Sequence, residues 1–527
     1  MSHLPISPLL LVPLALLLAV LLALFFTGRV PIGYNVRNLI VRWPMTLLTG
    51  LAFTLVIALL TVMLAFVNGM GKLTEESGHP DNVIVLADGA NDESFSNLPL
   101  NETSDVALQP GIKRWKEHEQ DKEATPLCSR ELFVIGTMPI APAAGKASVQ
   151  QMRGVVQKVL INQQSFVLTD ANGQEHTVRV DASAKVYTNN AEHKLENLKP
   201  DDTVWIASEQ RGGEMWATEV RASNKTRFIQ IRGLEDPLVA GEVHGLRLTS
   251  GAWFSSAGVA ALSEKEGKAT DTAVQAVIGH GLARELGQDV DPPRPLAVGD
   301  LFQLGPKRWK VVGILDSEGT TFDSEVWAKR SYVGQLYHKP DNLSSIVLRA
   351  DSPAGAKALV EDLKTNYKKV NLQPLTEPDY YAKLRGVIQQ LYIGIVVLTL
   401  FIAVGGIIGV MNTMFAAISQ RNKDIGVLRI VGYGRRQILV SFLLESLVIA
   451  LIGGALGCAL GSLCNGISAT SIVGSGQGGF GKSVIFRLAV DLNTIGIGLL
   501  LTLLMGLLGG LLPSLSAMRL RPLDAVR

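Results

Sequence analysis

The residues with the clearest chemical signature form a glycine-rich run near the C-terminus. The segment GQGGFGKS, at 476–483, has the spacing G-x-x-x-x-G-K-[ST] of a phosphate-binding loop, with Gly476, Gly481, Lys482 and Ser483 in the defining places. In a nucleotide-hydrolysing enzyme the backbone N–H groups of such a loop hold phosphates, and its lysine reaches the terminal phosphate. Whether this segment can act in that way depends on its compartment and on the secondary structure around it.

Five apolar stretches are each long enough to cross the ~30 Å hydrocarbon layer of a membrane as a helix. They cover residues 9–26, 45–70, 387–419, 438–464 and 492–512. The first could be a cleaved signal peptide, but no Lys or Arg precedes it and no clear cleavage site precedes Arg29, so we expect it to be retained. The sequence therefore predicts a multi-pass membrane protein with about five transmembrane helices.

Charge asymmetry between the links orients these spans. The link between the first two spans contains three arginines and no acid, the link at 420–437 contains five basic residues against Asp424, and the C-terminal tail is also basic. All three segments are expected on the cytoplasmic side of the cell (inner) membrane. Residues 72–386 and the loop 465–491 then lie on the exterior, or periplasmic, side.

This orientation argues against a nucleotide site at 476–483. The stretch VIFRLAVDL that follows is typical of an extended segment, whereas a phosphate-binding loop opens a helix, and no acidic strand end lies nearby to hold a metal ion. We expect a flexible exterior loop, no cofactor and no ATP site on this chain.

The exterior segment alternates short strands with a few helices. ELFVIGTMPI (131–140) and TRFIQIRGL (226–234) are expected to be strands of one sheet, and the five or six short strands between them predict an inserted small β-barrel at 151–223, similar in size to an OB-fold. No exposed aromatic and basic run indicates a nucleic-acid partner, and the formal net charge is only +2. The helix beginning near 377 is expected to continue into the third span.

No catalytic or metal-binding constellation stands out in the sequence. The eight histidines are scattered, and HEQDK at 118 lacks the second histidine of a zinc-protease helix. The three cysteines, Cys128, Cys458 and Cys464, form no disulfide framework and are interpreted as small apolar packing residues. We expect no enzyme activity.

The basic link between the third and fourth spans offers a cytoplasmic surface. Ile425 and Leu428 are three residues apart and share a face if the link is helical, which makes them candidate docking residues. A positive-inside anchor that only fixes topology is the alternative. Glu445 lies about two turns into the next span, where a carboxylate is costly, and is interpreted either as a structural cap or as part of coupling. Glycines at 405/409 and 453/457/461 are spaced for close helix contact, within one chain or between two.

The segment 411–461 resembles the FtsX-like permease domain of the MacB/FtsX/lipoprotein-release class of ABC transporters. The resemblance is carried by Asn412, Arg421, Asp424, Ile425, Gly426, Leu428, Arg429, Gly432, Glu445 and Gly453, and by the ending AMRLRPLDAVR with Arg519, Pro522, Asp524 and Arg527. It implies four core spans, so that 1–28 is an extra N-terminal helix, 29–71 an amphipathic entry and first core span, 72–386 a MacB-like α+β exterior domain, and 387–527 the permease domain. The barrel at 151–223 is also a departure from the family pattern.

The resemblance implies a permease subunit that couples ATP hydrolysis in a separate ATPase subunit to movement of its exterior domain, for export or extraction of a substrate. The segment from Arg421 to Gly432 would be the coupling segment. A second permease copy, in a homo- or heterodimer, and a periplasmic adaptor or effector would be partners. The alternatives are a mechanotransmission protein that transports nothing and controls an exterior partner such as a cell-wall hydrolase, or an anchored sensor without an ATPase.

Overall fold

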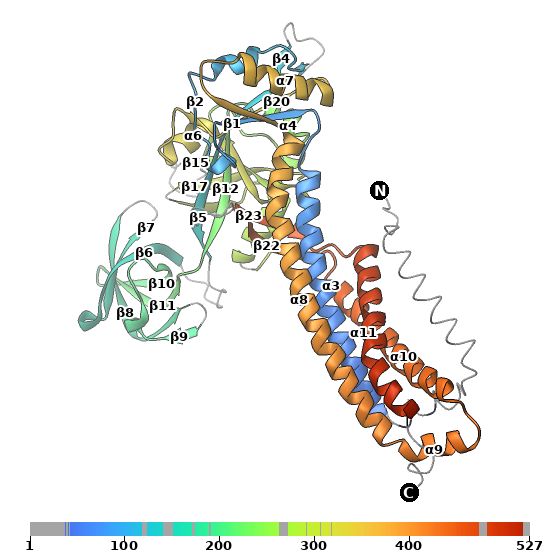
Figure 1. Ribbon diagram of the computed structural model, residues 1–527. Coiled ribbons are helices and arrows are strands. Elements are labelled where there is room, and N and C mark those ends of the chain that lie inside the picture. The colour runs from blue at the N-terminus through green and yellow to red at the C-terminus, as the bar shows by residue number, and fades with distance from the viewer. Residues whose placement is uncertain are drawn as a thin grey trace. The chain divides into compact units, whose positions relative to one another are not determined.

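The protein consists of two compact units, seen here in a computed structural model (Figure 1). The structure describes residues 37, 41, 43–117, 124–140, 151–170, 174–188, 191–262, 272–290, 292–305, 307–317, 319–473 and 482–519. The helical unit contains the chain up to Lys72, Arg385–Ala469 and the chain from Arg487. The exterior unit contains Leu73–Leu384 and Thr470–Phe486. The apolar stretch 9–26 lies outside the described residues.

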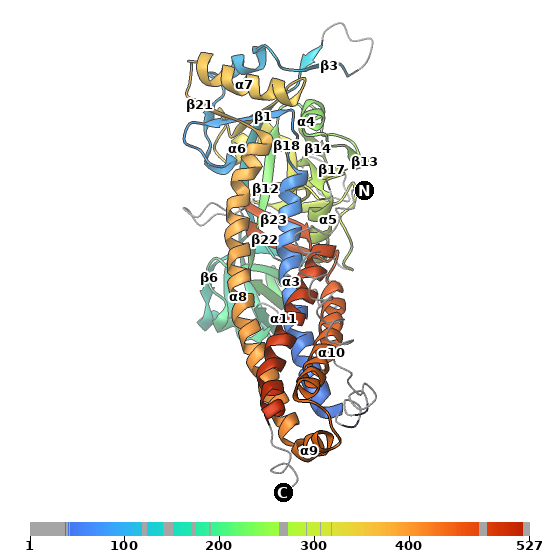
Figure 2. The same cartoon turned by 45° about the vertical axis from the view of Figure 1, so that its right-hand side comes forward.

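The helical unit is built from long apolar helices. They are α3 (Trp43–Glu76), α8 (Glu377–Ser419), α10 (Arg435–Ser462) and α11 (Leu492–Arg519), with the short α9 (Asn422–Ile430) between α8 and α10. Among the described residues, four helices are long and apolar enough to cross a membrane: Thr46–Leu73, Gln389–Ser419, Arg435–Ser462 and Leu492–Arg519. These correspond to the second to fifth expected spans. Figure 2 shows α8 as one continuous helix, as expected for the segment after 377.

Close packing of α10 against α3 depends on glycine. A Cβ atom at Gly453 would lie 2.6 Å from the Gly50 carbonyl oxygen, and one at Gly457 would lie 2.7 Å from the Thr54 carbonyl oxygen. The Thr54 hydroxyl donates a hydrogen bond of 3.0 Å to the Gly453 carbonyl, which the short separation of the helices makes possible. The glycines on α10 therefore serve packing within one chain, as small residues do between membrane helices.

The exterior unit is organised around an 11-stranded mixed sheet. Nine of its strands follow the order β13-β17-β15-β18-β12-β5-β20-β1-β21, and of the other two, β14 pairs with β15 and β16 pairs with β17. Its strands are β1 (Asn82–Ala87), β5 (Cys128–Pro139), β12 (Thr226–Leu234), β13 (Leu248–Gly251), β14 (Val259–Ala261), β15 (Thr272–Gly279), β16 (Leu301–Leu304), β17 (Lys307–Leu315), β18 (Glu325–Lys329), β20 (Ser345–Arg349) and β21 (Leu372–Thr376). The prediction that 131–140 and 226–234 are strands of one sheet is confirmed, and the two strands, β5 and β12, are antiparallel neighbours in it.

Helices and small ladders cover this sheet. The helices are α4 (Pro237–His244), α5 (His280–Leu286), α6 (Arg330–Leu336) and α7 (Pro353–Asn366), and the short 3-10 turns are Glu93–Phe95, Ser104–Leu108, Gly287–Asp289 and Thr321–Ser324. Two-residue strands pair as β2 (Leu98–Pro99) with β19 (Asn342–Leu343) and β3 (Arg114–Trp115) with β4 (Thr125–Pro126). β20, α7 and β21 follow one another along the chain, and β1 lies between the two strands in the sheet.

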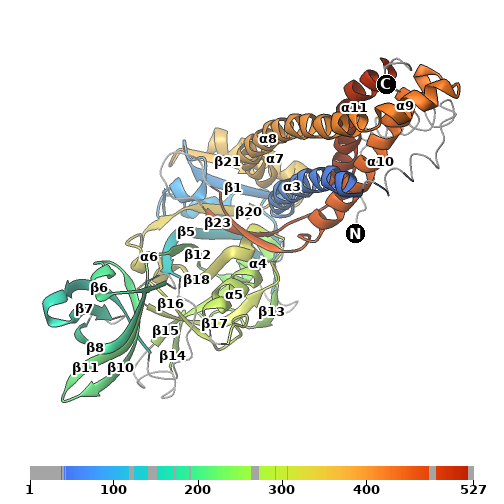
Figure 3. The ribbon, with the colours of Figure 1, turned by 90° about the horizontal axis from the view of Figure 1, so that it is seen from below.

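The segment between β5 and β12 forms the expected small barrel. Its strands are β6 (Gln151–Leu160), β7 (Ser165–Asp170), β8 (Glu175–Thr188), β9 (Ala191–His193), β10 (Thr203–Arg211) and β11 (Glu214–Ser223), with 3-10 turns at Ile161–Gln163 and Leu195–Asn197. The order β11-β10-β6-β7-β8 is closed by parallel pairing of β11 with β8, which is the strand order of an OB-fold. In Figure 3 these strands form a group of their own. A separate apolar core, including Val156, Phe166 and Val220, fills the barrel.

The loop between α10 and α11 belongs to the exterior unit. It forms a hairpin of β22 (Ser468–Val473) and β23 (Lys482–Arg487). Ile485 is buried in the main core of the exterior unit, and its backbone N–H donates a hydrogen bond of 2.8 Å to the Ser324 hydroxyl. The extended conformation predicted for this segment is present as β23, but the segment is packed in the exterior core rather than part of a flexible loop.

Candidate functional site

The link between α8 and α10 is a compact helical turn at one end of the helical unit. α8 ends at Ser419, α9 covers Asn422–Ile430, and α10 begins at Arg435. The chain reverses at Gly432, whose φ of 109° lies in the left-handed region where a side chain is strained. Tyr433 N–H then donates to the Leu428 carbonyl at 3.1 Å and closes the end of α9. The helix expected between residues 420 and 437 is present, although it is shorter than the link.

A buried ion pair joins this link to α10. The Arg421 guanidinium donates two hydrogen bonds to the Glu445 carboxylate, at 2.7 and 2.8 Å. Arg421 is 3% exposed and Glu445 is 5% exposed, and the guanidinium also lies 5.7 Å from the centre of the Phe442 ring. Two residues that the sequence analysis treated separately thus form one bidentate pair, the geometry in which arginine binds a carboxylate most specifically.

The ion pair fixes the position of α9 because Arg421 is the residue immediately before it. Burying two charges is costly, and the pair is tolerated only because each charge is matched with good geometry. The Glu445 carboxylate is therefore more than a cap of its own helix: it holds the start of α9 against α10.

Ile425 is placed differently from what the sequence analysis expected. It is 1% exposed and packs with Ile418, Ile438, Phe442 and Ala517, so it is an interior residue and not a docking residue. Leu428 is half-buried. The expectation that Ile425 and Leu428 form an accessible apolar face is wrong, because α9 turns its Ile425 side toward the helices it connects.

The accessible apolar residues of α9, together with Val431, the residue that follows it, lie on another face. Val427, Ile430 and Val431 are 53%, 65% and 71% exposed. Their spacing of three and four residues places them together on one side of the helix. We call these three residues the α9 apolar face. Exposed apolar residues that lie together on one side of a helix can form a contact surface.

Charged residues flank the α9 apolar face. Lys423 and Asp424 are exposed in the first turn, Arg429 is half-buried in the last turn, and Arg435 and Arg436 are exposed at the start of α10. An acidic residue in the first turn and a basic residue in the last turn both stabilise a helix, because each interacts favourably with the helix dipole. Gly426 is buried. Arg519 ends α11, whereas Pro522, Asp524 and Arg527 lie outside the described residues.

The glycine-rich motif does not have the secondary structure of a phosphate-binding loop. Lys482 begins strand β23, and the segment through Arg487 is extended, not helical. Gly476 and Gly481 lie outside the described residues. Within the described parts of the chain, no group of three or more His, Cys, Asp and Glu residues could hold a metal ion.

The exterior unit contains a second cluster that sequence reasoning missed. Arg232 on β12, 3% exposed, lies among three carboxylates and donates to Glu325 at 2.7 and 2.8 Å and to Glu93 at 2.8 Å. It also donates to Glu131, which in turn bonds His244 on α4 at 2.7 Å. No local sequence pattern predicts this cluster, because its members come from five different elements.

The cluster extends to the first turn of α8. Glu377 is 2% exposed, accepts hydrogen bonds of 2.9 Å from His79 N–H and from the Asn82 amide, and lies 4.0 Å from His244. Burial raises the pKa of Glu377. Burial also disfavours the charged form of His244, but the Glu131 carboxylate outweighs it, so the pKa of His244 is raised. The helix that contains the span Gln389–Ser419 is thus bonded at its exterior end into the sheet.

These features define a class of protein: a multi-pass membrane protein with a helical unit that contains four apolar helices long enough to cross a membrane and a second, α+β unit. The FtsX-like permease C-terminal family model matches residues 396–522, and the MacB-like periplasmic core domain model matches residues 160–366. The chain therefore contains a region similar to FtsX-like permeases and a region similar to the MacB-like periplasmic core.

Curated relatives agree with this assignment. The chain is 27% identical over 259 residues to an uncharacterized ABC transporter permease of Methanocaldococcus jannaschii, covering 48% of this chain and 61% of the relative. It is 25% identical over 315 residues to the macrolide export ATP-binding/permease protein MacB of Shewanella sp. (strain ANA-3), covering 58% of this chain and 44% of that protein. The chain thus spans about half the length of the curated relatives it matches.

Among solved structures, the periplasmic region of MacB from Actinobacillus actinomycetemcomitans is 11% identical and has a TM-score of 0.28. The match covers 59% of this chain and 95% of that one.

Proposed function

We propose that this chain is the transmembrane subunit of an ABC transporter in a cell (inner) membrane, and that a separate ATPase subunit docks on α9. ATP-driven movement of α9 would pass through α8 to the exterior domain. The observation that carries this proposal is the α9 apolar face, three exposed apolar residues on a helix that a buried ion pair holds in place.

Two properties of α9 suit a surface that receives force. Its position is fixed on the inner side by Ile425 and by the Arg421–Glu445 pair, so a push on the helix reaches α8 and α10. Its outer side presents apolar groups ringed by charges, the composition of a protein contact whose apolar centre supplies most of the binding energy.

The exterior end of α8 suits the transmission of movement. α8 is continuous over 43 residues, and its first turn is bonded into the exterior sheet through Glu377. Tyr380 on the same turn is 1% exposed and donates a hydrogen bond of 3.1 Å to Asp92. Movement of this helix would therefore act on the sheet itself. Such movement serves either export of a substrate or control of an exterior partner, for example an adaptor or a cell-wall hydrolase.

Co-purification tests the docking surface. We expect the variant Val427→Asp/Ile430→Asp to insert normally but to lose a co-purifying ABC ATPase, identified by mass spectrometry and by ATP hydrolysis. Each substitution puts a charge into an apolar contact and leaves the interior of the chain unchanged. The matched control is Val298→Asp, an exposed valine (45%) of the exterior unit, which should keep the ATPase.

The result that contradicts the proposal is retention of the ATPase by the double variant in correctly inserted protein. A wild-type chain that purifies from its native membrane with no ABC ATPase would also contradict it and would favour an anchored sensor.

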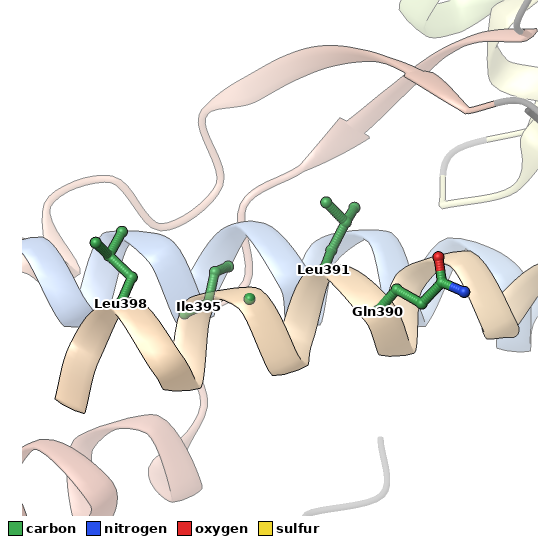
Figure 4. Close-up of a pocket in the computed structure, with 5 residues that line it drawn as sticks. Gln390, Leu391, Ile395 and Leu398 are labelled. Atoms are coloured by element: carbon green, nitrogen blue, oxygen red, sulfur yellow. The ribbon is translucent and has the colours of Figure 1, made fainter. Parts of the chain in front are cut away.

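We further propose that a second permease copy packs on α8. Only 11% of its span is buried within the chain, compared with 61% for α10. Gly405 and Gly409 have no atom within 4 Å of an added Cβ, in contrast to the glycines of α10. Figure 4 shows Leu391, Ile395 and Leu398 on this helix, lining a shallow apolar hollow. A glycine pair four residues apart on an uncovered apolar helix is typical of helix association in membranes.

Substitution at the glycine pair tests this contact. We expect Gly405→Leu to shift the detergent-purified permease from dimer toward monomer in size-exclusion chromatography with light scattering. The control is Val404→Leu, which enlarges the exposed neighbouring side chain (49%) without filling the glycine position. An unchanged mass for Gly405→Leu would exclude this face as the contact.

A further inference from the structure

A cavity of about 420 Å³ lies in the exterior unit between helix α6 and the sheet strands β14, β15 and β17. Its size falls within the range of about 300–1,000 Å³ that is usual for small-molecule sites. It is lined by Val259, Thr272, Val274, Lys307, Trp309, Tyr332, Gln335, Leu336 and His338. None of these residues belongs to α9 or to the cluster around Arg232.

Strand register gives the cavity an apolar floor. Val259 pairs with Val274, and Val274 pairs with Trp309, so the three side chains lie in one row on the same face of the sheet. Val274 is 7% exposed and Trp309 is fully buried, while Leu336 closes the side formed by α6. A ligand in contact with this row would have to bring an apolar body.

The same register gives the cavity a polar edge. Thr272 and Lys307 each lie two residues before a member of the apolar row, on parallel strands, so they are neighbours at one end of the floor. Tyr332 and Gln335 line the cavity from α6. No side-chain hydrogen bond or ion pair joins these four residues to any other residue that the structure describes, and none of the described residues that line the cavity is a carboxylate.

His338 adds a further observation at the cavity wall. Its φ is 56°, in the left-handed region, at the position after α6 where glycine is the unstrained choice. Lys339 N–H donates to the Gly334 carbonyl at 2.7 Å, which fixes this turn and holds the imidazole beside the cavity. Histidine is strained relative to glycine at such a position, because its Cβ crowds the backbone. The imidazole therefore lies at the cavity wall although its backbone conformation is unfavourable.

We propose that this cavity binds a small amphipathic anion, an apolar body of about two rings that carries one carboxylate or similar group. The apolar body would lie on the row Val259–Val274–Trp309, and the anionic group would accept hydrogen bonds from Lys307 and Thr272. Charge complementarity selects an anion, because Lys307 is a cation without a carboxylate partner among the described residues. The exterior domain thus has a ligand-binding function in addition to any role in transmitting movement.

The test uses the full chain in lipid nanodiscs and 6-fluoro-2-naphthoate as the probe, with binding read from fluorine NMR line broadening. Empty nanodiscs measure partition into lipid. The neutral analogue 6-fluoro-2-naphthamide has the same rings without the charge. We expect saturable binding of the carboxylate to the wild-type chain and weaker binding of the amide.

Variants separate the two parts of the site. Lys307→Met should weaken carboxylate binding about 10-fold, the order of one charge-assisted hydrogen bond, and leave the amide unchanged. Val259→Trp and Gln335→Trp, which fill the cavity from a half-buried strand and from an exposed helix position, should each abolish binding of both probes. Lys357→Met, at an exposed lysine of α7, is the matched control and should bind as the wild type does.

Three results would overturn the proposal. They are no broadening beyond empty nanodiscs, carboxylate binding that survives both Lys307→Met and the filling variants, and equal affinity for the carboxylate and the amide. Because two independent filling variants are used, misfolding of one of them, recognised by circular dichroism, leaves the test intact.

Discussion

The buried pair Arg421–Glu445 makes the most direct prediction about the helical unit. Glu445→Gln keeps the size of the side chain and removes its negative charge. The guanidinium of Arg421 would then remain in a site where the residue is 3% exposed, with a neutral acceptor in place of a carboxylate. Its Nε atom already has no hydrogen-bond partner among the described residues, so the charge has little other compensation.

The expected magnitude follows from the cost of leaving one buried charge without its partner. Removal of one member of such a pair costs about 3–5 kcal/mol. For domains of 150–250 residues, each kcal/mol lowers the melting temperature by about 2–4 °C. We therefore expect Glu445→Gln to lower the melting temperature of the helical unit by roughly 6–20 °C.

A double-mutant cycle separates the pair from the individual residues. Arg421→Met alone leaves the Glu445 carboxylate buried and unpaired, so it should be as harmful as Glu445→Gln. The double variant Arg421→Met/Glu445→Gln leaves no buried charge and should melt at a higher temperature than either single variant. Replacement of a buried ion pair by uncharged groups is often close to neutral.

Circular dichroism at 222 nm in a fixed detergent is a suitable assay, because the helical unit supplies most of the long helices. Arg436→Met is the control, since it removes an exposed arginine at the start of α10 and should change the melting temperature by little. A melting temperature for Glu445→Gln within about 2 °C of wild type, or a double variant in which the two losses simply add, would refute the reasoning.

Three further predictions concern other parts of the chain. The pKa of His244 is raised in the folded state, so the stability that this residue contributes is complete below its ordinary pKa and is lost as the pH rises through the raised value. The melting temperature of the exterior unit should therefore fall as the pH rises above about 6.5. A His244→Gln variant whose melting temperature falls with pH at the same slope would contradict this prediction. Gly453→Ala should destabilise the helical unit by about 1–3 kcal/mol through overpacking against α3, whereas Gly405→Ala should not, as melting curves of the two variants would show. Lys482→Ala should leave the ATPase activity of the assembled transporter unchanged, and loss of activity with normal assembly would restore a nucleotide-binding role for the glycine-rich loop.

Much of the architecture follows from local patterns along the chain. The apolar stretches after residue 45 became helices because a run of about 20 apolar residues has few other stable forms. The segments 131–140 and 226–234 were predicted as strands of one sheet, and the regular short strands between them predicted the barrel. The resemblance of the segment from Arg421 to Gly432 to a permease motif already pointed to the link between α8 and α10.

The accessible face of that link could not be read from the sequence. Spacing shows which residues of α9 share a side, but only the packing of α8, α10 and α11 decides which side is covered. Ile425 is covered and Val427, Ile430 and Val431 are not. A mixed apolar and basic segment of nine residues contains no signal that separates these two sets.

What the sequence by itself determined is therefore the position of the apolar helices after residue 45, the presence of a separate barrel, and the resemblance to the FtsX-like permease family. Tertiary structure alone decided that Arg421 meets Glu445, that Arg232 gathers three glutamates, and that Ile485 of a loop near the C-terminus enters the exterior core. The physical reason is the separation along the chain over which each kind of interaction acts. Periodicity and composition act between neighbours in the chain, whereas a buried charge or an apolar side chain takes its partner from whatever element the completed fold places beside it.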